Sequence, residues 1–418
     1  MISLFNLLNV TFLRFFGALI AFIFTIILTK TLTPNDVGVF LYQLTIVSIA
    51  AVFSRVGLEA IMVKNVSINN KNILESTSHA YLIIIINLIV SLLISIIFYM
   101  ISDYIFKDES LVSFKLFIFS IVPMVINFMM GELAKGKKSP KVATLIQVII
   151  APLIFIFIIL TSSESLNLTA VVGSYLQSTV IGFFISAMIV LYKFSHELDS
   201  FKVKLIKIKH LLLTGLPLLI ATSLGLIIAW SDTIIIGAYS TYEDVAIYSI
   251  AVKISLIMTL VLMAVNSIVA PKYAQLYAEN KIDLLAAMAQ KASSILTIIA
   301  LTSFVVLLIL SSYLLQFFGE EYMGAAYLLY VLLIGQLVNV STGSVSLLLN
   351  MTGHQKILMK ISIISAVINI VLNILFFYFW GLIGVAIATT FTIALSNILQ
   401  MYQVKKYLGF YSFSFRLR

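Results

Sequence analysis

The sequence predicts an all-α polytopic membrane protein with twelve transmembrane helices. Of its 418 residues, 61% are hydrophobic and only 10% are charged, and the mean hydropathy is +1.13. These values lie outside the range of soluble globular domains. A helix needs about 20 mainly apolar residues to cross the hydrocarbon core, where it satisfies its own backbone hydrogen bonds. Twelve stretches of about this length follow one another along the chain.

The twelve predicted spans leave only short connections. They cover residues 10–30, 37–62, 79–101, 113–134, 142–162, 169–192, 211–237, 245–270, 291–315, 324–349, 357–379 and 382–404. The first span is expected to stay in the membrane, because no basic segment precedes it and no small-residue cleavage site follows it. The chain contains no cysteine, which excludes disulfides, thiolate metal sites and thiol nucleophiles.

The distribution of basic residues predicts the orientation of the spans. If the N-terminus lies inside, most of the 26 Lys and Arg fall in cytoplasmic connections or in the C-terminal tail, whereas acids gather in the opposite connections. An excess of Lys and Arg in short loops marks the cytoplasmic side. We therefore expect cytoplasmic N- and C-termini. The net charge of +9 is interpreted as loop charge, not as a nucleic-acid-binding surface.

A basic connection near the middle of the chain divides it into two sets of six spans. We expect an N-terminal six-helix bundle at 1–192, a basic cytoplasmic linker at 193–210, a C-terminal six-helix bundle at 211–404 and a basic cytoplasmic tail at 405–418. An internal repeat supports this division. The segment "TPNDVGVF" at 33–40 matches "TYEDVAIY" at 241–248, at an offset that also aligns Lys64 with Lys272. Repeats of six spans keep the same orientation in the membrane.

Ionisable residues within the spans are the first functional candidates. A charge at the centre of a membrane helix costs about 2.5–3.5 kcal/mol on insertion scales, so it usually faces a partner or a water-filled cavity. Glu132 is followed closely by "AKGKKSPK" and is interpreted as an interface residue that pairs with those lysines. The six candidates are Arg14, Arg55, Glu59, Glu132, Asp232 and Lys253.

Three of the cations are candidates for a shared cavity. Arg55 lies roughly 13 Å along a helix from Lys64, too far to reach that interface. Glu59 follows four residues later, on the same helical face, and can pair with Arg55. Lys253 has no acid three or four residues away, so it depends on another helix or on water. Two simpler interpretations remain open: Arg14 extends to the cytoplasmic interface, and Glu59 merely neutralises Arg55 at a helix contact.

The three cations together suggest the chemistry of a ligand. Arg14, Arg55 and Lys253 would give a cationic interior between the two halves, which attracts anions. Arginine binds phosphate in bidentate fashion. A phosphorylated lipid substrate follows as a hypothesis.

Oxygen-bearing side chains in the second half form another group of candidates. Asp232 ends the apolar run "LPLLIATSLGLIIAWSD", and Pro217, fifteen residues before it, can bend that helix. The group has two interpretations: interhelical hydrogen bonds with Asp232 at the outer interface, or coordination of a small cation. The other members are the amides Asn369 and Asn373, four residues apart, and the hydroxyls Thr389 and Thr390.

No sequence feature indicates an enzyme. The outer connections are short, and neither a Walker A sequence nor a metal-spaced histidine cluster occurs. The four histidines, His79, His196, His210 and His354, fall near the predicted cytoplasmic interface. We expect no catalytic residue, no cofactor and no metal beyond a coupling Na+ or H+.

The order of several motifs resembles one known family. The segments that carry the resemblance are "LTKTLTPNDVGVFLYQLTIVSIAAVFSRVGLEAIMVKN" (28–65), "LPLLIATSLGLIIAWSDTIIIGAYSTYEDVAIYSIAVKIS" (216–255), "APKYAQLYAENK" (270–281), "FGEEYMGAA" (318–326) and "LLLNMTGHQK" (347–356). Together they are similar to Wzx-type polysaccharide and O-antigen flippases of the multidrug/oligosaccharidyl-lipid/polysaccharide (MOP) exporter superfamily. The resemblance covers essentially the whole chain.

The resemblance implies a fold, an activity and a location. It implies a V-shaped pair of six-helix bundles that works by alternating access in the bacterial inner membrane. The substrate would be an undecaprenyl-diphosphate-linked oligosaccharide, such as an O-antigen or another surface polysaccharide repeat unit. The expected partners are that lipid-linked oligosaccharide, membrane lipids, and the glycosyltransferases and polysaccharide polymerase of the same pathway.

The resemblance also implies roles for individual residues. In related lipid II flippases, cations on the first, second and eighth helices meet the diphosphate, and Arg14, Arg55 and Lys253 occupy similar positions. Those relatives have a sodium site on the seventh, eleventh and twelfth helices, similar to Asp232, Asn369, Asn373 and a Thr389 or Thr390 hydroxyl. An amide replaces a carboxylate at the second position of the eleventh helix, so proton coupling and uncoupled transport also stay open.

Three alternatives belong to other functional classes. A multidrug exporter of the same superfamily predicts acids in the cavity, whereas this sequence supplies more cations. A polysaccharide polymerase or ligase predicts a long outer loop with Arg or His, which is absent. A passive scaffold for glycan assembly leaves the charges at membrane depth without a role.

Overall fold

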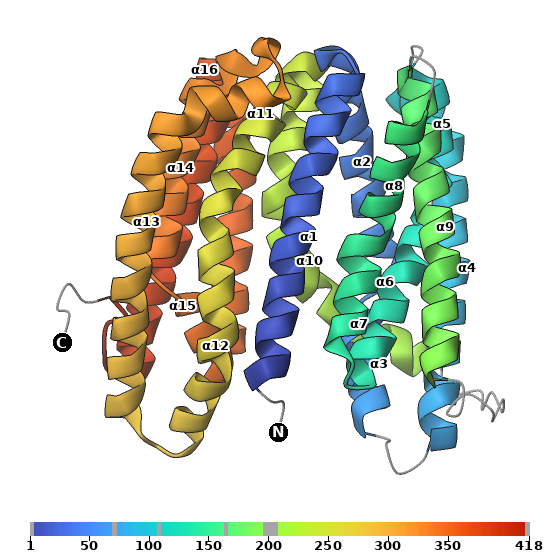
Figure 1. Cartoon of the computed structure of the whole chain (residues 1–418). Coiled ribbons are helices and arrows are strands. Elements are labelled where there is room, and N and C mark those ends of the chain that lie inside the picture. The colour runs from blue at the N-terminus through green and yellow to red at the C-terminus, as the bar shows by residue number, and fades with distance from the viewer. Residues whose placement is uncertain (1–3, 69–72, 107–109, 163–165, 195–207, 414–418) are drawn as a thin grey trace. The chain divides into compact units, whose positions relative to one another are not determined.

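The computed structural model describes residues 4–68, 73–106, 110–162, 166–194 and 208–413. Regular structure in this part of the chain is helical throughout (Figure 1). Most of the predicted linker at 193–210 and the end of the predicted tail lie outside the described residues. The helices are α1 (Leu4–Thr31), α2 (Pro34–Ser54), α3 (Leu58–Ile68), α4 (Ile73–Ile105), α5 (Ser110–Ile118), α6 (Ile121–Gly136), α7 (Pro140–Thr144), α8 (Ile150–Thr161), α9 (Leu168–Phe194), α10 (Ile208–Tyr239), α11 (Tyr242–Ser255), α12 (Thr259–Ala278), α13 (Ile282–Phe318), α14 (Ala326–Ser341), α15 (Val345–Met351) and α16 (Gln355–Leu408).

The helices account for the predicted spans. Ten segments of the described chain are long and apolar enough to cross a membrane. One of them, α16, has 54 residues, and a straight helix of that length would be roughly 80 Å long, more than twice the thickness of the hydrocarbon core. Gly381 interrupts it with φ 59° and ψ −137°, a conformation that favours glycine. Counting both arms of α16 and the 32-residue α10 gives the predicted twelve spans, a number that stays a prediction.

Several of the predicted spans are interrupted along their length, which hydropathy did not reveal. The prediction of one continuous helix over 37–62 was wrong, because α2 ends at Ser54 and α3 begins at Leu58. Val56 and Gly57 between them have φ values of 52° and 69°. Glu59 is therefore not on the same continuous helical face as Arg55. A hydrogen-bonded turn of π-helix at 145–149 and a 3-10 turn at 256–258 interrupt two further spans.

The chain forms two compact units. Unit one contains residues 1–11 and 224–418, and unit two contains residues 12–223, so the divisions fall within α1 and α10. The predicted domain limits at 192 and 211 lie at the end of α9 and the start of α10, and they stay a prediction.

Unit two has an aromatic core. Phe24, Phe40, Phe117 and Phe155 surround Tyr175, and the ring centroids of Phe24 and Phe155 are 4.5 Å apart. These residues come from α1, α2, α5, α8 and α9 respectively. Rings at 4.5–7 Å stabilise a core beyond their buried area, so this cluster joins helices that are distant in sequence.

Unit one packs around aliphatic residues. Buried members of α12, α13, α15 and α16 form one cluster, which includes Val269, Leu285, Leu348 and Val404. Figure 1 shows α13, α14 and α16 running side by side, and α14 packs directly against both α13 and α16.

The internal repeat forms the same local structure in both units. Thr33 caps α2 by accepting a hydrogen bond from the Asp36 backbone N at 3.3 Å, and Thr241 caps α11 by accepting one from Asp244 N at 3.2 Å. A threonine at this position satisfies a backbone N–H that the helix leaves without a partner. The aspartates also place negative charge at the positive ends of the helices. The matched segments therefore start equivalent spans.

Candidate functional site

Among the described helices, each unit has one polar cluster centred on a buried charged residue, Asp232 in unit one and Arg55 in unit two. We call the first the aspartate cluster; it consists of Ser231, Asp232, Tyr248, Asn369, Asn373 and Thr389. We call the second the arginine cluster; it consists of Arg55, Glu59, Phe128, Glu132, Lys135 and Gln147.

The aspartate cluster is centred on one carboxylate. Asp232 of α10 is only 5% exposed. Its Oδ1 accepts a hydrogen bond from Asn373 Nδ2 at 2.6 Å, and its Oδ2 accepts hydrogen bonds from Tyr248 Oη at 2.6 Å and Thr389 Oγ1 at 2.8 Å. Hydrogen bonds to an ionised acceptor are about twice as strong as neutral ones. Three donors therefore stabilise the carboxylate in a place where water does not reach it.

Further hydrogen bonds connect the two amide side chains of α16 to Ser231 and Thr389. Ser231 Oγ donates to Asn369 Oδ1 at 2.7 Å, and Asn373 Nδ2 lies 3.3 Å from the same oxygen. Asn369 Nδ2 donates to Thr389 Oγ1 at 3.4 Å. The two arms of α16 thus meet at Asp232 through Asn373 on one side and Thr389 on the other, and Asn369 connects to Thr389 directly.

The donor set of the aspartate cluster suits a small hard cation. Such ions prefer carboxylate, amide and hydroxyl oxygens. Asn373 Oδ1 is buried without a hydrogen-bond partner among the described residues, and an orphaned buried oxygen is an available ligand. No group of three or more His, Cys, Asp and Glu that could hold a metal occurs in the described chain, so the site is one of mixed oxygens around a single carboxylate.

The structure brings four of the five predicted coupling-ion residues together. Asp232, Asn369, Asn373 and Thr389 share the cluster, whereas Thr390 Oγ1 donates to the Val331 carbonyl oxygen at 2.8 Å. Pro217 lies within α10, which continues through that position.

The sequence prediction did not include Tyr248 and Ser231 as members of this cluster. Ser231 adjoins Asp232 in the chain, and that adjacency is a signal. A tyrosine in an apolar helix gives no comparable signal, because the same residue commonly packs in a core.

The arginine cluster lies where the second span is broken. Arg55 follows the last residue of α2 and is 8% exposed. Its guanidinium carbon lies 3.9 Å from the centroid of the Phe128 ring, a cation–π contact. The carboxylates of Glu59 and Glu132 both attract it electrostatically. The guanidinium Nε has no hydrogen-bond partner within the described chain.

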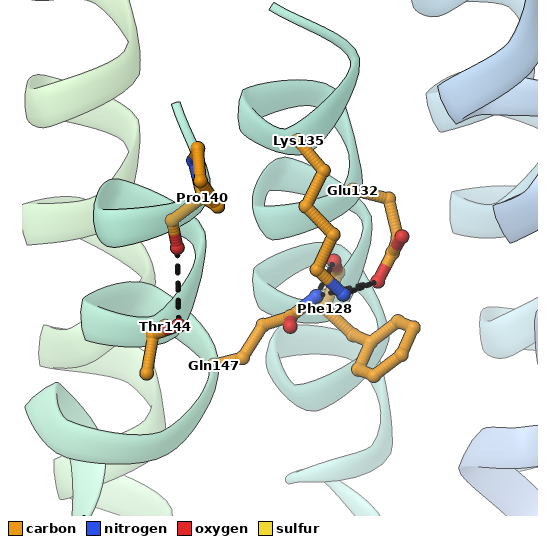
Figure 2. A network of polar contacts seen from close by, with 6 residues as sticks. All are labelled: Phe128, Glu132, Lys135, Pro140, Thr144 and Gln147. Atoms are coloured by element: carbon orange, nitrogen blue, oxygen red, sulfur yellow. Dashed lines mark hydrogen bonds and ion pairs between the residues drawn. The ribbon is translucent and has the colours of Figure 1, made fainter. Parts of the chain in front are cut away.

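Three further polar groups meet beside the same ring (Figure 2). Glu132 Oε1 accepts hydrogen bonds from Lys135 Nζ at 2.5 Å and from Gln147 Nε2 at 2.8 Å. Gln147 Nε2 also donates to the Phe128 carbonyl oxygen at 2.9 Å. The Glu132–Lys135 ion pair is the contact that the sequence predicted for Glu132. The roles of Lys135 and Gln147 were not predicted, since Lys135 looked like one of several loop lysines.

The structure at Gln147 is unusual for a membrane helix. Gln147 lies in the π-helical turn, and π turns are frequent at functional sites. A Cβ atom at Gly131 would lie 2.5 Å from the Gln147 side chain. Glycine at 131 therefore leaves the space that Gln147 uses to reach Glu132.

The other two predicted cavity cations lie outside the arginine cluster. Arg14 is on α1 and is exposed, and Lys253 is in the last turn of α11 and is half-buried. Arg14 and Arg55 belong to unit two and Lys253 to unit one. A shared role of the three cations remains a prediction.

The fold is shared with solved transporters of low sequence identity. The lipid II flippase MurJ in an inward closed conformation gives a TM-score of 0.77 at 16% identity, covering 95% of this chain and 87% of that one. An inward-facing multidrug resistance MATE family transporter of the MOP superfamily gives 0.75 at 16% identity, covering 97% and 95%. The chain thus has the same fold as these two transporters, and the predicted all-α class is confirmed.

Family models cover much of the sequence. The model described as "Polysaccharide biosynthesis protein" matches residues 4–277, and the MatE model matches residues 217–375. The chain belongs to the polysaccharide biosynthesis protein family. This result confirms the resemblance found in the sequence and the prediction that the protein is not an enzyme, since the family consists of transporters.

The sequence relatives include two probable flippases. "Probable low-salt glycan biosynthesis flippase Agl15" of Haloferax volcanii is 26% identical over 189 residues, covering 44% of this chain and 39% of the relative. "Probable flippase AglR" of the same organism is 25% identical, covering 43% and 38%. The matches therefore span about two fifths of the length of each flippase. The uncharacterized membrane protein MJ1068 of Methanocaldococcus jannaschii is 25% identical over 422 residues, covering 94% and 82%.

Proposed function

We propose that this protein is a flippase that moves a lipid-linked oligosaccharide across the membrane by alternating access. The observation that carries the proposal is the arginine cluster: a buried guanidinium at a helix break, with its Nε lacking a partner in the described chain. A buried, preorganised arginine suits a phosphate group, which it can bind through two parallel hydrogen bonds. The family, and the glycan biosynthesis named for one relative, support a glycan carried on such a group.

The finer assignment follows the sequence resemblance. The substrate is an undecaprenyl-diphosphate-linked repeat unit of an O-antigen or another surface polysaccharide, and the location is the bacterial inner membrane with both termini in the cytoplasm. Arg14, Arg55 and Lys253 contact the diphosphate, and Glu59 pairs with Arg55 in the absence of substrate. The pathway partners are glycosyltransferases and a polysaccharide polymerase.

The aspartate cluster has a separate role in this proposal. Asp232, Asn369, Asn373 and Thr389 hold the coupling ion, Na+ or H+. A bound cation would neutralise the Asp232 carboxylate, which otherwise relies on the three short hydrogen bonds. The first part of α10 belongs to unit two, and the part that contains Asp232 belongs to unit one. Binding or release of the ion at Asp232 would therefore act on a helix that both units share.

The experiment that tests the function is a deletion in a cell that makes the glycan. Loss of this protein should leave lipid-linked repeat units on the cytoplasmic side, protected in spheroplasts from an externally added glycosidase that reaches the outer leaflet of the inner membrane. Their normal appearance outside would contradict the proposal. Complementation with the wild-type chain at normal protein levels is the control.

A multidrug exporter is the second candidate, and one observation favours it. The MatE model covers the segment that contains Asp232, Tyr248, Asn369 and Asn373, and a buried carboxylate attracts cationic drugs. Efflux of a cationic dye that depends on Asp232, together with unchanged glycan export in the deletion strain, would favour the exporter.

A further inference from the structure

The Lys135 side chain, which is 34% exposed, runs back along α6 toward the Phe128 ring. It lies in the last turn of α6, where a lysine ordinarily extends its ammonium group toward water. Its Nζ instead lies 5.7 Å from the centroid of the Phe128 ring, whose residue precedes Lys135 by seven positions, or about 10 Å of helix. Figure 2 shows the Lys135 side chain running along α6 toward this ring.

Phe128 therefore has two cations beside it. The Arg55 guanidinium carbon is 3.9 Å from the ring centroid and Lys135 Nζ is 5.7 Å from it, so the cations are no farther apart than the sum of these distances. Like charges at this separation repel each other, because Arg55 is buried and water screens the pair only on the Lys135 side. An arrangement that keeps them together needs anions.

Glu132 is the anion that holds Lys135 in place. Its Oε1 accepts hydrogen bonds from both Lys135 and Gln147, and its carboxylate also attracts Arg55. Glu132 is 6% exposed, so its charge depends on these partners. With Glu59, the cluster contains two cations and two anions.

We infer that Lys135 is a second phosphate-binding cation beside Arg55, and that Glu132 is an internal counter-anion which a phosphate group replaces on Lys135. The substrate phosphate is the diphosphate ester of the proposed function, on which this inference rests. A phosphate has several acceptor oxygens, so it can meet the Lys135 ammonium and the Arg55 Nε at once. Glu132 keeps the empty site neutral and competes with the ligand, which favours its release.

The inference predicts opposite effects for the two members of one ion pair. Lys135→Gln removes a ligand contact and should weaken phosphate binding about tenfold or more, the range of one charge-assisted hydrogen bond. Glu132→Gln removes the competitor, keeps the shape of the side chain, and should tighten binding by a similar factor. A merely structural ion pair predicts weaker binding, or no change, in both variants.

The experiment is calorimetric titration of the full-length protein in lipid nanodiscs. One arm uses inorganic pyrophosphate and the other a polyprenyl diphosphate without sugar, so the two sources of the same chemistry are separated. Opposite effects of K135Q and E132Q in either arm support the inference, and the arm identifies the source. Lys115→Gln is the matched control, because Lys115 forms an ion pair of 2.8 Å with Asp103 in the same unit, outside the arginine cluster; it should bind like the wild type.

A double variant separates direct contact from misfolding. K135Q alone leaves Glu132 buried without its cation, which can destabilise the fold, so the thermal unfolding midpoint of each variant is measured first. In the E132Q background no buried carboxylate is left without a cation. There, K135Q should still weaken phosphate binding about tenfold. No further effect there, equal binding by all variants, or no binding of either probe by the wild type would overturn the inference.

Flipping and phosphate binding, both measured on the same protein, distinguish a failure of this inference from a failure of the proposed function. If oligosaccharide flipping is absent but the opposite binding effects occur, the flippase proposal fails and the phosphate site stands. If flipping occurs and depends on Arg55 while K135Q and E132Q bind phosphate like the wild type, the flippase stands and the role of Lys135 is refuted.

Discussion

Asp232→Asn tests whether the aspartate cluster holds a cation. The exchange keeps the shape of the side chain and removes its charge. In the wild type, the carboxylate accepts hydrogen bonds of 2.6–2.8 Å from Asn373, Tyr248 and Thr389. An asparagine at 232 can still accept from Asn373, and the Tyr248 and Thr389 hydroxyls can turn to accept from its amide group. The variant should therefore fold.

The expected change in stability is small, whereas the change in ion binding is large. Replacing charge-assisted hydrogen bonds by neutral ones costs about 1 kcal/mol each, but removing a buried charge offsets this loss. A cation that binds only the folded protein stabilises it by about 2.7 kcal/mol at a concentration of 100 times Kd. For 418 residues, at roughly 2.1 cal/mol/K of unfolding entropy per residue, this corresponds to about 3 °C in Tm. D232N should lose that increase.

The assay is thermal unfolding of the purified protein in NaCl and in choline chloride at equal ionic strength. Asp244→Asn is the matched control, because Asp244 is an acid of unit one that accepts a hydrogen bond from Ser240 outside the cluster. D244N should keep the sodium effect, and Tyr248→Phe should reduce it, since it removes one of the three donors that orient Asp232. A sodium-dependent increase of equal size in D232N and the wild type would refute the sodium site. If pH gradients but not sodium drive transport, the coupling ion is the proton.

Two further predictions concern the break in the second span. Arg55→Lys keeps the charge but loses the planar contact with Phe128. The transport rate should therefore fall about tenfold or more at normal protein levels. Wild-type transport rates in R55K would show that any cation suffices at this position. Gly57→Ala should lower stability by more than the roughly 1–2 kcal/mol of a left-handed alanine, because φ is +69° and the added Cβ would lie 2.1 Å from the Gly215 carbonyl oxygen. The thermal unfolding midpoint of the variant measures this loss. Gly173→Ala is the control, since a Cβ at that position meets nothing within 4 Å. Equal midpoints for G57A and G173A would contradict the observed packing.

Hydropathy predicted the positions of the helices but not their interruptions. The run at 37–62 contains enough apolar residues to cross the membrane, and a window of that length averages over the turn at 55–57. The left-handed Val56 and Gly57 are stabilised by packing against α10, where a Cβ at Gly215 would lie 2.4 Å from the Val56 carbonyl oxygen. Such a contact between distant segments has no local sequence signal.

The two clusters differ in how far the sequence predicted them. The spacing of Asn369 and Asn373, the position of Asp232 at the end of an apolar run and the hydroxyl of Thr389 on the next span indicated four members of the aspartate cluster. In the arginine cluster, the pairing of Arg55 with Glu59 was inferred from an unbroken helix. In the structure Glu59 still attracts Arg55 electrostatically across the break, and Glu132 and the Phe128 ring, which the sequence did not place there, also act on Arg55.

The proposed flippase activity is tested most directly by transport in proteoliposomes. The measurement is the initial rate at which a polyprenyl-diphosphate-linked oligosaccharide, loaded in one leaflet, becomes accessible to a glycosidase on the other side. The wild type should accelerate this movement, and the triple variant R14Q/R55Q/K253Q should be slower by at least about a hundredfold, since three cation–phosphate contacts are lost. Equal rates for the wild type and the triple variant at matched protein content would contradict the proposal.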